Sequence, residues 1–409
     1  MHYIIVNRLI TAVGSILVIS LITNAIPPAQ YGELTLALTL FNFFTALLMA
    51  PLGQGLARTF VTSRKLNKAE DFFLMVKALY KKVILIFLIA FLVLGVVLES
   101  NESEGIYLVA FVIFYAFLFG VHDHFTSLHN MAQSWRFFAS IAVLDVATKL
   151  LFLSLIIWFF PITNEIVFFT YIVALSVVLI GHKKKFHILV EQASKRNQKK
   201  SSVMHWQKRT VQVAYPALFW GAAQWIHQSA DKWALFYFHD AADVGRYAVL
   251  YQLVYMPYVM VMGVFLTWYM PKIYQHKHDG TPIRRLIRIN IFACAVTFAV
   301  CALFGEHLLT LIVGAEYVGL ESLMPFVVLG SGLYCIGDVM SQRFMQALKT
   351  RHMLFVRFSS SALGALISII GAQVSGISGV VIGLVGYGIV YVCACMVAAS
   401  HLARKRLVA

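Results

Sequence analysis

Charged residues are scarce in this chain. Only 12% of its 409 residues are Asp, Glu, Lys or Arg, whereas 60% are hydrophobic. Soluble globular domains carry roughly 25% charged residues and about 45–50% apolar residues. This composition excludes an ordinary soluble fold and indicates a protein whose surface meets lipid.

The sequence also lacks the motifs of several binding and enzyme classes. No GxxxxGK[ST] loop is present, which argues against ATP as the direct energy source. The histidines of "HDHFTSLH" have no supporting thiolate, so we expect neither a metal nor another cofactor. No CxxC pair occurs, and we expect the five cysteines, which all lie inside apolar runs, to be buried hydrophobic residues: Cys294, Cys301, Cys335, Cys393 and Cys395.

Apolar runs are what the chain has in abundance. Each is about 18–22 residues long, enough to cross a hydrocarbon core about 30 Å thick. We read the first run as a transmembrane helix rather than a cleaved signal peptide, because it is long and has no convincing small-residue cleavage site. The fold class predicted is an all-α polytopic membrane protein with twelve spans: 5–26, 34–54, 80–98, 105–122, 138–160, 162–181, 211–230, 246–269, 286–304, 322–342, 355–373 and 376–399.

Basic residues are distributed unevenly among the predicted loops. All of the 33 Lys and Arg except Lys149, Lys232 and Arg246 fall at or beyond span ends on one side, whereas the loops on the other side are acidic or neutral. Cytoplasmic loops accumulate Lys and Arg, so both termini are predicted to be cytoplasmic. The same rule accounts for the net charge of +15, and we expect no nucleic acid partner.

The longest basic loop, 182–210, falls near the middle of the chain, with six predicted spans before it and six after. This suggests two parallel repeats. The segment "PPAQYGELTLALTL" resembles "DAADVGRYAVLYQL", which aligns Gly32 with Gly245. We therefore predict an N-terminal six-helix bundle over 1–181, a basic cytoplasmic linker over 182–210 that is a tether rather than a folded domain, and a C-terminal six-helix bundle over 211–409.

Residues 25–38, "AIPPAQYGELTLAL", separate the first two predicted spans. We interpret them as a tight extracytoplasmic turn, in which proline ends the first helix and Gly32 relieves the backbone as the second begins.

This turn resembles the SPxxYG turn of the polysaccharide (O-antigen, Wzx-type) flippases in the multidrug/oligosaccharidyl-lipid/polysaccharide exporter (MOP) superfamily. Three further stretches are similar to motifs of that family, in the same order: 53–60 to GLxxAxxR, 229–253 to D-[RK]…GxY, and 303–330 to FGxx…GxEY.

The resemblance implies a MATE-like arrangement of two six-helix bundles in a bacterial inner membrane. It also implies a flippase that moves an oligosaccharide repeat unit linked to undecaprenyl pyrophosphate, for O-antigen or capsule synthesis, by alternating access. The partners implied are this lipid-linked oligosaccharide, membrane lipids and other polysaccharide assembly proteins.

Two arginines are candidates for binding the pyrophosphate. Arg8 and Arg58 lie near the predicted cytoplasmic ends of the first two spans. An arginine fork holds phosphate through charge-assisted hydrogen bonds. The alternative is that both side chains snorkel to the membrane surface.

Further candidates lie inside the spans. Aromatic and amide side chains suit stacking on sugars and bonding to their hydroxyls, or else packing between helices, and such side chains follow spans seven and eight: Trp220, Gln224, His227, Tyr251 and Tyr255. Ionic groups inside a membrane are costly and mark structural pairs or coupling sites. Asp145 and Lys149, four apart with the acid first, suit an ion pair; with Asp338 they are the candidates for ion coupling.

Two other functions are considered. A cation-coupled multidrug exporter of the same superfamily needs acids in its cavity, whereas a pyrophosphate carrier needs bases. The candidate bases (Arg8, Arg58, Lys149, Lys232, Arg343) outnumber the candidate acids (Asp145, Asp231, Asp338), which favours the flippase. A membrane polysaccharide polymerase or acyltransferase would be expected to carry a large periplasmic catalytic loop. The predicted extracytoplasmic loops are short, so we do not expect an enzyme.

Overall fold

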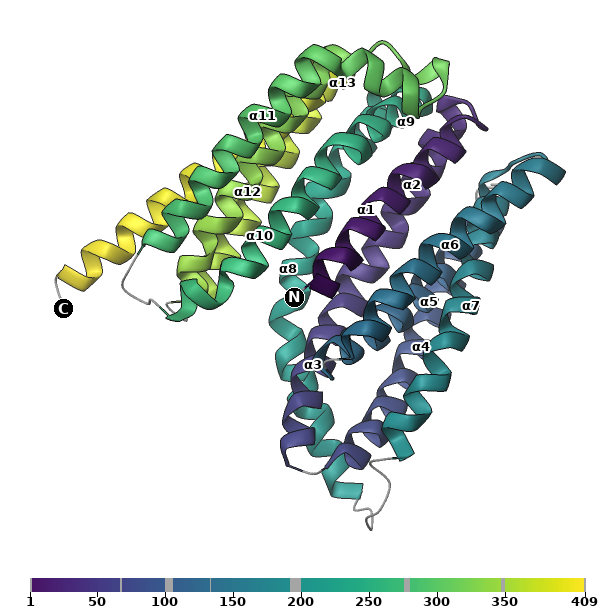
Figure 1. Ribbon diagram of the computed structural model, residues 1–409, viewed down its shortest axis with the longest axis vertical. Coiled ribbons are helices and arrows are strands. Elements are labelled where there is room, and N and C mark those ends of the chain that lie inside the picture. Colours follow the sequence, from purple (N-terminus) through teal and green to yellow (C-terminus); the bar gives the residue numbers. More distant parts are fainter. Residues whose placement is uncertain are drawn as a thin grey trace. The chain divides into compact units, whose positions relative to one another are not determined.

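The computed structural model is helical throughout the part of the chain that it describes (Figure 1). It describes residues 2–66, 68–99, 106–132, 134–191, 200–275, 280–346 and 350–407, and over these residues it has no strand. The helices are α1 (His2–Thr23), α2 (Pro28–Phe44), α3 (Ala50–Lys65), α4 (Ala69–Glu99), α5 (Ile106–Met131), α6 (Trp135–Phe159), α7 (Asn164–Glu191), α8 (Lys200–Phe238), α9 (Ala241–Leu250), α10 (Met256–Gln275), α11 (Thr281–Ile312), α12 (Met324–Gln346) and α13 (Thr350–Leu407). The predicted all-α fold is confirmed.

Short irregular helices join some of these elements. The π-helical turn η1 (Thr45–Met49) connects α2 to α3, and the π-helical turn η2 (Tyr251–Tyr255) connects α9 to α10. Each of these two segments is therefore one continuous helix. Two 3-10 turns, η3 (Ala315–Tyr317) and η4 (Glu321–Leu323), lie between α11 and α12.

Ten segments of the described chain are long and apolar enough to cross a membrane. One of them, within α13, consists of two helices that meet at Ser375 and Gly376, where Gly376 has a φ of 58°. This break coincides with the predicted boundary between the last two spans. The predicted span 211–230 lies in α8, which is helical but too polar to count among the ten. The chain is therefore a multi-pass membrane protein.

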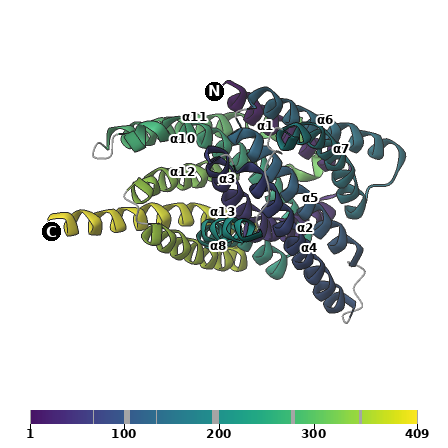
Figure 2. The ribbon, with the colours of Figure 1, turned by 90° about the horizontal axis from the view of Figure 1, so that it is seen from below.

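The chain divides into two compact units. The N unit comprises residues 1–14 and 37–225, and the C unit comprises residues 15–36 and 226–409. In the N unit α5 packs against α3 and α7, and α6 packs against α7; in the C unit α12 packs against α11 and α13. Figure 2 gives a second view of these helices. The domain boundaries at 181 and 211 stay a prediction.

Most of the predicted linker is helical. Helix α7 continues to Glu191 and α8 begins at Lys200, so that 182–191 and 200–210 extend these two helices. Residues 192–199 of the linker lie outside the described residues. The charged, polar sequence that we interpreted as a tether is compatible with helix wherever it continues a membrane-spanning rod.

The turn at 25–38 differs from the prediction in one respect. Helix α1 ends at Thr23 and α2 begins at Pro28, where a proline is tolerated because the first-turn N–H has no helical partner. Gly32, however, lies inside α2 and does not have a positive φ. The prediction that Gly32 relieves strain in the backbone at the start of this helix is therefore wrong. A Cβ on Gly32 would lie 1.7 Å from the Ala241 carbonyl oxygen, so Gly32 is there to let α2 approach α9.

Gly245 has the reciprocal role in the same contact. A Cβ at this position would lie 2.0 Å from the Pro28 carbonyl oxygen. Gly32 and Gly245 are the two residues that the internal sequence match aligns, and the C unit brings them together. Close backbone approach at glycines is a common way for membrane helices to associate.

Candidate functional site

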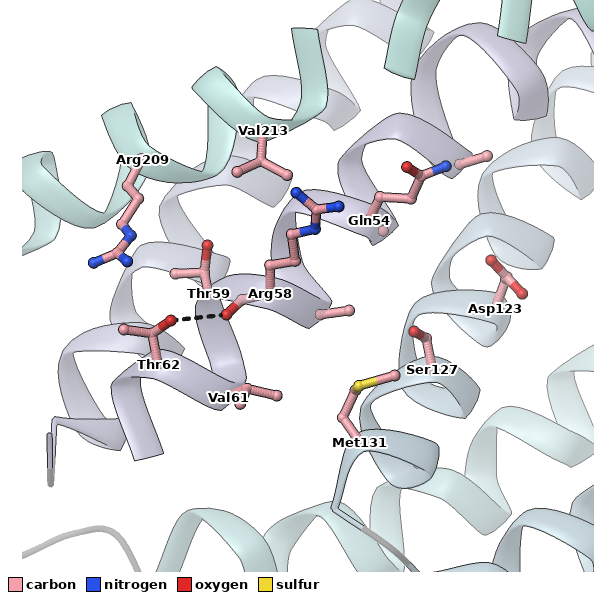
Figure 3. A pocket seen from close by; sticks show the side chains of 13 residues that line it. Gln54, Arg58, Thr59, Val61, Thr62, Asp123, Ser127, Met131, Arg209 and Val213 are labelled. Carbon is pink, nitrogen blue, oxygen red and sulfur yellow. Dashed lines mark hydrogen bonds between the residues drawn. The ribbon is translucent and has the colours of Figure 1, made fainter. Parts of the chain in front are cut away.

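The N unit contains a cavity of about 870 Å³. Three helices of this unit form its walls, and Figure 3 shows arginines from α3 and α8 at one side with α5 at the other. The lining residues are Ala50, Gly53, Gln54, Ala57, Arg58, Thr59, Val61, Thr62, Asp123, Ser127, Met131, Arg209 and Val213.

Two glycines of "GQGLARTF" place α3 in this position. A Cβ on Gly53 would lie 2.7 Å from the His124 ring of α5, and a Cβ on Gly55 would lie 2.6 Å from the Thr210 carbonyl oxygen of α8. Their lack of side chains therefore allows α3 to pack closely against both neighbours. Gln54, between them, and Arg58, one turn later, are exposed and face the cavity.

Side-chain hydrogen bonds hold the walls together. The hydroxyls of Thr59 on α3 and Thr210 on α8 lie 3.0 Å apart. His124 Nε2 lies 2.7 Å from the Met49 carbonyl oxygen and must donate to it, so His124 Nδ1 accepts the Tyr80 hydroxyl at 2.6 Å. His124 is thus a structural residue that joins α4 and α5 to the π-helical turn before α3.

The cavity has an excess of positive charge. Arg58 and Arg209 come from different helices, and the carboxylate among the lining residues is that of Asp123 on α5. In the part of the chain that the structure describes, neither guanidinium forms an ion pair with a carboxylate. The Arg209 guanidinium lies 5.8 Å from the centroid of the Trp206 ring on the same helix, a cation–π contact. Two exposed arginines that pair with no described carboxylate form a site suited to an anion.

Of the two arginines predicted to bind pyrophosphate, one lines this cavity. Arg58 does, whereas Arg8, an exposed residue of α1, is not among the lining residues. Arg209 was missed by sequence reasoning, which counted it as one base of the linker. Its position just before the predicted span 211–230, on the same predicted side of the membrane as Arg58, is the sequence signal that would have identified it.

The candidates for sugar contact are divided between the units. Trp220 and Gln224 belong to the N unit and are half-buried. His227, Tyr251 and Tyr255 belong to the C unit, where each is at most 8% exposed.

In the C unit these side chains are part of an aromatic cluster. The His227 ring stacks on Tyr387 with centroids 3.7 Å apart, and its Nε2 lies 3.0 Å from the Tyr255 hydroxyl. Tyr255 in turn stacks on Tyr251 at 4.5 Å. In this conformation the three side chains contact one another and neighbouring helices.

The candidate acids have internal counter-ions. Lys149 Nζ donates to Asp145 Oδ2 at 2.8 Å along α6, as the spacing predicted. Asp338 accepts a hydrogen bond of 2.8 Å from Arg357, which is 3% exposed and also donates to the Tyr334 hydroxyl. Sequence reasoning did not identify Arg357 as this partner, because 19 residues and a helix boundary separate the two.

Comparison with known proteins bears on the fold. No protein-family model matches the chain, and no curated protein matches it in sequence. Among solved structures, an inward-facing multidrug resistance MATE family transporter of the MOP superfamily is similar with a TM-score of 0.73 at 14% identity, over 98% of each chain. The chain has the fold of the MATE transporters.

Two further structures share this fold. A mutant of the Vibrio cholerae MATE transporter VcmN matches with a TM-score of 0.66 at 16% identity, over 98% of this chain and 97% of that one. The lipid II flippase MurJ, in an inward closed conformation, matches with a TM-score of 0.67 at 13% identity, over 97% of this chain and 86% of that one. The MATE-like fold class predicted from the sequence is confirmed, and it occurs both in multidrug transporters and in a lipid flippase.

Proposed function

We propose that this protein is a MOP-superfamily transporter that moves an oligosaccharide linked to a polyprenyl pyrophosphate across a bacterial inner membrane for surface polysaccharide synthesis. The observation that carries the proposal is the cavity of the N unit, in which Arg58 and Arg209 face a common space and form no ion pair with a carboxylate of the described residues. The fold shared with a lipid flippase and the four motifs that resemble Wzx-type flippases support it.

The chemistry of the cavity suits a pyrophosphate better than a cationic cargo. A pyrophosphate diester carries two negative charges on neighbouring phosphorus centres, and guanidinium groups bind such oxygens through paired N–H donors. Arg58 on α3 and Arg209 on α8 present these donors from two helices, while Gln54 adds an amide. Arg8, exposed on α1, remains a candidate for the first contact with the lipid head group.

The residues that would contact the oligosaccharide are proposed from their aromatic and amide side chains. Trp220 and Gln224 of the N unit remain candidates to contact the oligosaccharide. A contact with His227, Tyr251 or Tyr255 requires these side chains to leave the C-unit cluster during the transport cycle.

A multidrug exporter is the second candidate, and Asp123 is the observation that favours it. A carboxylate in the cavity wall would suit a cationic drug. The two arginines oppose such a cargo, so we rank this function below the flippase.

Binding measurements distinguish the two functions. The full-length chain in nanodiscs is titrated with inorganic pyrophosphate and with farnesyl pyrophosphate by calorimetry. We expect Arg58→Ala and Arg209→Ala each to weaken both affinities about tenfold, which corresponds to about 1.4 kcal/mol for one charge-assisted contact. Arg58→Lys should retain part of the affinity, because an ammonium keeps the charge but loses the fork.

The matched control is Arg64→Ala. Arg64 lies on the same helix, is exposed and does not line the cavity, so its loss should leave both affinities unchanged. If Arg58→Ala binds pyrophosphate as tightly as Arg64→Ala, the cavity is not a pyrophosphate site. Binding of a cationic dye that is abolished by Asp123→Asn would favour the multidrug function instead.

A further inference from the structure

The cavity wall that α5 forms differs in its chemistry from the wall that carries the arginines. Asp123, Ser127 and Met131 line it at intervals of four residues, so they form one stripe along the helix, which we call the α5 stripe. Gln54 and Arg58 of α3 have the same spacing. Figure 3 shows the α5 stripe at one side of the cavity and these α3 residues at the other. The cavity thus has a cationic side and a side with one acid and neutral groups.

A contact between α3 and α5 sets the level at which the two sides face each other. A Cβ on Gly53 would lie 2.7 Å from the His124 ring, so the backbone of α3 meets α5 at this point. Gln54 follows Gly53 in the chain, and Asp123 precedes His124. The Gln54 amide and the Asp123 carboxylate therefore come from the same level of the cavity, and both residues line it.

The polar side chains of the α5 stripe have no partner among the described residues. The Asp123 carboxylate, which is exposed, forms neither an ion pair nor a hydrogen bond with them. The Ser127 hydroxyl makes no hydrogen bond with them either. By contrast, the Thr62 hydroxyl of α3 donates to the Arg58 carbonyl oxygen at 3.1 Å, as helical threonines often do. Asp123 and Ser127 are therefore free to bind a ligand in the cavity.

The surroundings of Asp123 select the kind of group that it can bind. A carboxylate accepts hydrogen bonds from cations and from neutral O–H and N–H donors. Arg58 and Arg209 repel a cationic group in the same cavity, whereas they do not repel hydroxyls or amides. Met131, which is 42% exposed, adds an apolar surface for the C–H face of a ring. A carboxylate and a hydroxyl beside an apolar surface suit a sugar.

The cavity has room for more than a pyrophosphate. Its volume is about 870 Å³, and pockets of about 300–1,000 Å³ enclose drug-sized ligands. Two phosphates bound by Arg58 and Arg209 would occupy the arginine side. The space along α5 then remains for the group that is bonded to the pyrophosphate.

We propose that the α5 stripe is a subsite for the first sugar of the cargo, the one bonded to the pyrophosphate, and that this sugar is neutral. The inference rests on the proposed function, because the arginines must hold the pyrophosphate. Asp123 accepts hydrogen bonds from ring hydroxyls or from an acetamido N–H, Ser127 adds a hydroxyl, and Met131 packs against the ring. The Gln54 amide reaches the sugar from α3. A uronic acid is disfavoured, because its carboxylate would lie beside that of Asp123.

Three diesters of farnesyl pyrophosphate test this subsite, in calorimetric titrations of the full-length chain in nanodiscs. The second ester group is methyl, N-acetylglucosaminyl or glucuronosyl, so the first two ligands differ in the sugar but not in charge. We expect the wild type to bind the N-acetylglucosaminyl diester about tenfold more tightly than the methyl diester, which corresponds to one or two hydrogen bonds. It should bind the glucuronosyl diester less tightly than the N-acetylglucosaminyl diester.

Asp123→Asn should act on the two neutral diesters in opposite directions. The methyl diester should bind about threefold more tightly, because a negative charge near the pyrophosphate is removed. The N-acetylglucosaminyl diester should lose most of its advantage over the methyl diester, because charge-assisted hydrogen bonds to the sugar are lost. Ser127→Ala should reduce this advantage about threefold without changing the methyl diester. Ser140→Ala, at an exposed position of α6 outside the cavity, is the matched control and should change neither affinity.

The subsite is overturned if the methyl diester binds in a way that depends on Arg58 but the N-acetylglucosaminyl diester binds no more tightly. It is also overturned if the advantage of the sugar survives both Asp123→Asn and Ser127→Ala. A wild type that binds the glucuronosyl diester as tightly as the N-acetylglucosaminyl diester, or more tightly, overturns the choice of a neutral sugar. Failure of all three diesters to bind contradicts the proposed function itself, and the subsite with it.

Discussion

The cavity arginines of the N unit differ from Arg357 of the C unit in whether a carboxylate of the protein binds them. In the N unit Arg58 and Arg209 are exposed in a cavity and form no ion pair with the described carboxylates. In the C unit Arg357 is 3% exposed, binds Asp338 at 2.8 Å and contacts the hydroxyls of Tyr334 and Tyr391. A cation inside a membrane protein is costly unless it has a partner, and Arg357 has one within the protein, whereas Arg58 and Arg209 are available to a ligand.

Lys232 of the C unit follows the same pattern as Arg357. Its ammonium lies 3.2 Å from Asp231 and donates to the Gln228 carbonyl oxygen at 2.6 Å. It also lies 4.1 Å from the centroid of the Tyr251 ring, a cation–π contact. Asp231 and Asp338 of the C unit are thus each bound by a cation of the same unit, which is why we place the ligand site in the N unit.

The largest effect is expected when the counter-ion of the C unit is removed. Arg357→Met deletes the cation that Asp338 binds and leaves two tyrosine hydroxyls without their donor. Removing one partner of a buried pair costs about 3–5 kcal/mol. Because Asp338 is 25% exposed, we expect about 3 kcal/mol, the lower end of the range. The measurement is the thermal unfolding midpoint of the purified protein.

A double-mutant cycle gives the control for this change. Asp338→Asn in the Arg357→Met background removes the unpaired charge, so the double variant should be more stable than Arg357→Met alone. The matched change in the N unit, Arg58→Met, should leave the midpoint within error. Equal destabilisation by Arg58→Met and Arg357→Met would abolish the contrast between the units.

An intermediate effect is expected at the glycine contact of the C unit. Gly32→Ala and Gly245→Ala each place a methyl group about 2 Å from a backbone oxygen, which cannot move aside as a side chain can. Overpacking of this kind costs about 1–3 kcal/mol. The free energy of unfolding, or the midpoint in a denaturant series, measures it.

Gly263 is the control glycine. It lies in α10, and nothing is within 4 Å of a Cβ built there. Alanine is the better helix former, by roughly 1 kcal/mol in a helix interior, so Gly263→Ala should leave stability unchanged or raise it. A loss of stability at Gly263 equal to that at Gly32 would show that the close approach of α2 and α9 is not the cause.

The smallest effect is expected when Asp123, the acid in the cavity of the N unit, is replaced. Asp123 forms no ion pair with the residues that the structure describes, so Asp123→Asn should leave stability unchanged, unlike the change of a paired acid in the C unit. Removing its negative charge should strengthen pyrophosphate binding about threefold, since exposed charges interact by only about 1 kcal/mol at close range. Weaker pyrophosphate binding by Asp123→Asn would show that this acid contacts the cargo rather than repelling it.

How far the candidate site follows from sequence depends on the distance between the residues involved. The Asp145–Lys149 pair was predictable, because residues four apart share a helix face. The Asp338–Arg357 pair and the meeting of Arg58 with Arg209 were not, because each joins side chains of different helices. Asp123 and Ser127 likewise share a face of α5, but no spacing rule shows that this face meets Arg58 across a cavity.

The sequence by itself determined that this is a membrane protein, approximately where its membrane-spanning helices lie, and which residues share a face of each helix. These follow from local physics: hydrophobic length matches the bilayer, and helical periodicity sets the faces. Tertiary structure decided which face meets protein. Lipid tails are as apolar as leucine side chains, so the hydrophobic pattern of a spanning helix does not distinguish a surface that contacts lipid from one that contacts a neighbouring helix. For this reason Tyr251 and Tyr255 became part of a buried cluster, Gly32 became a contact between helices, and Arg58 gained a second arginine across a cavity.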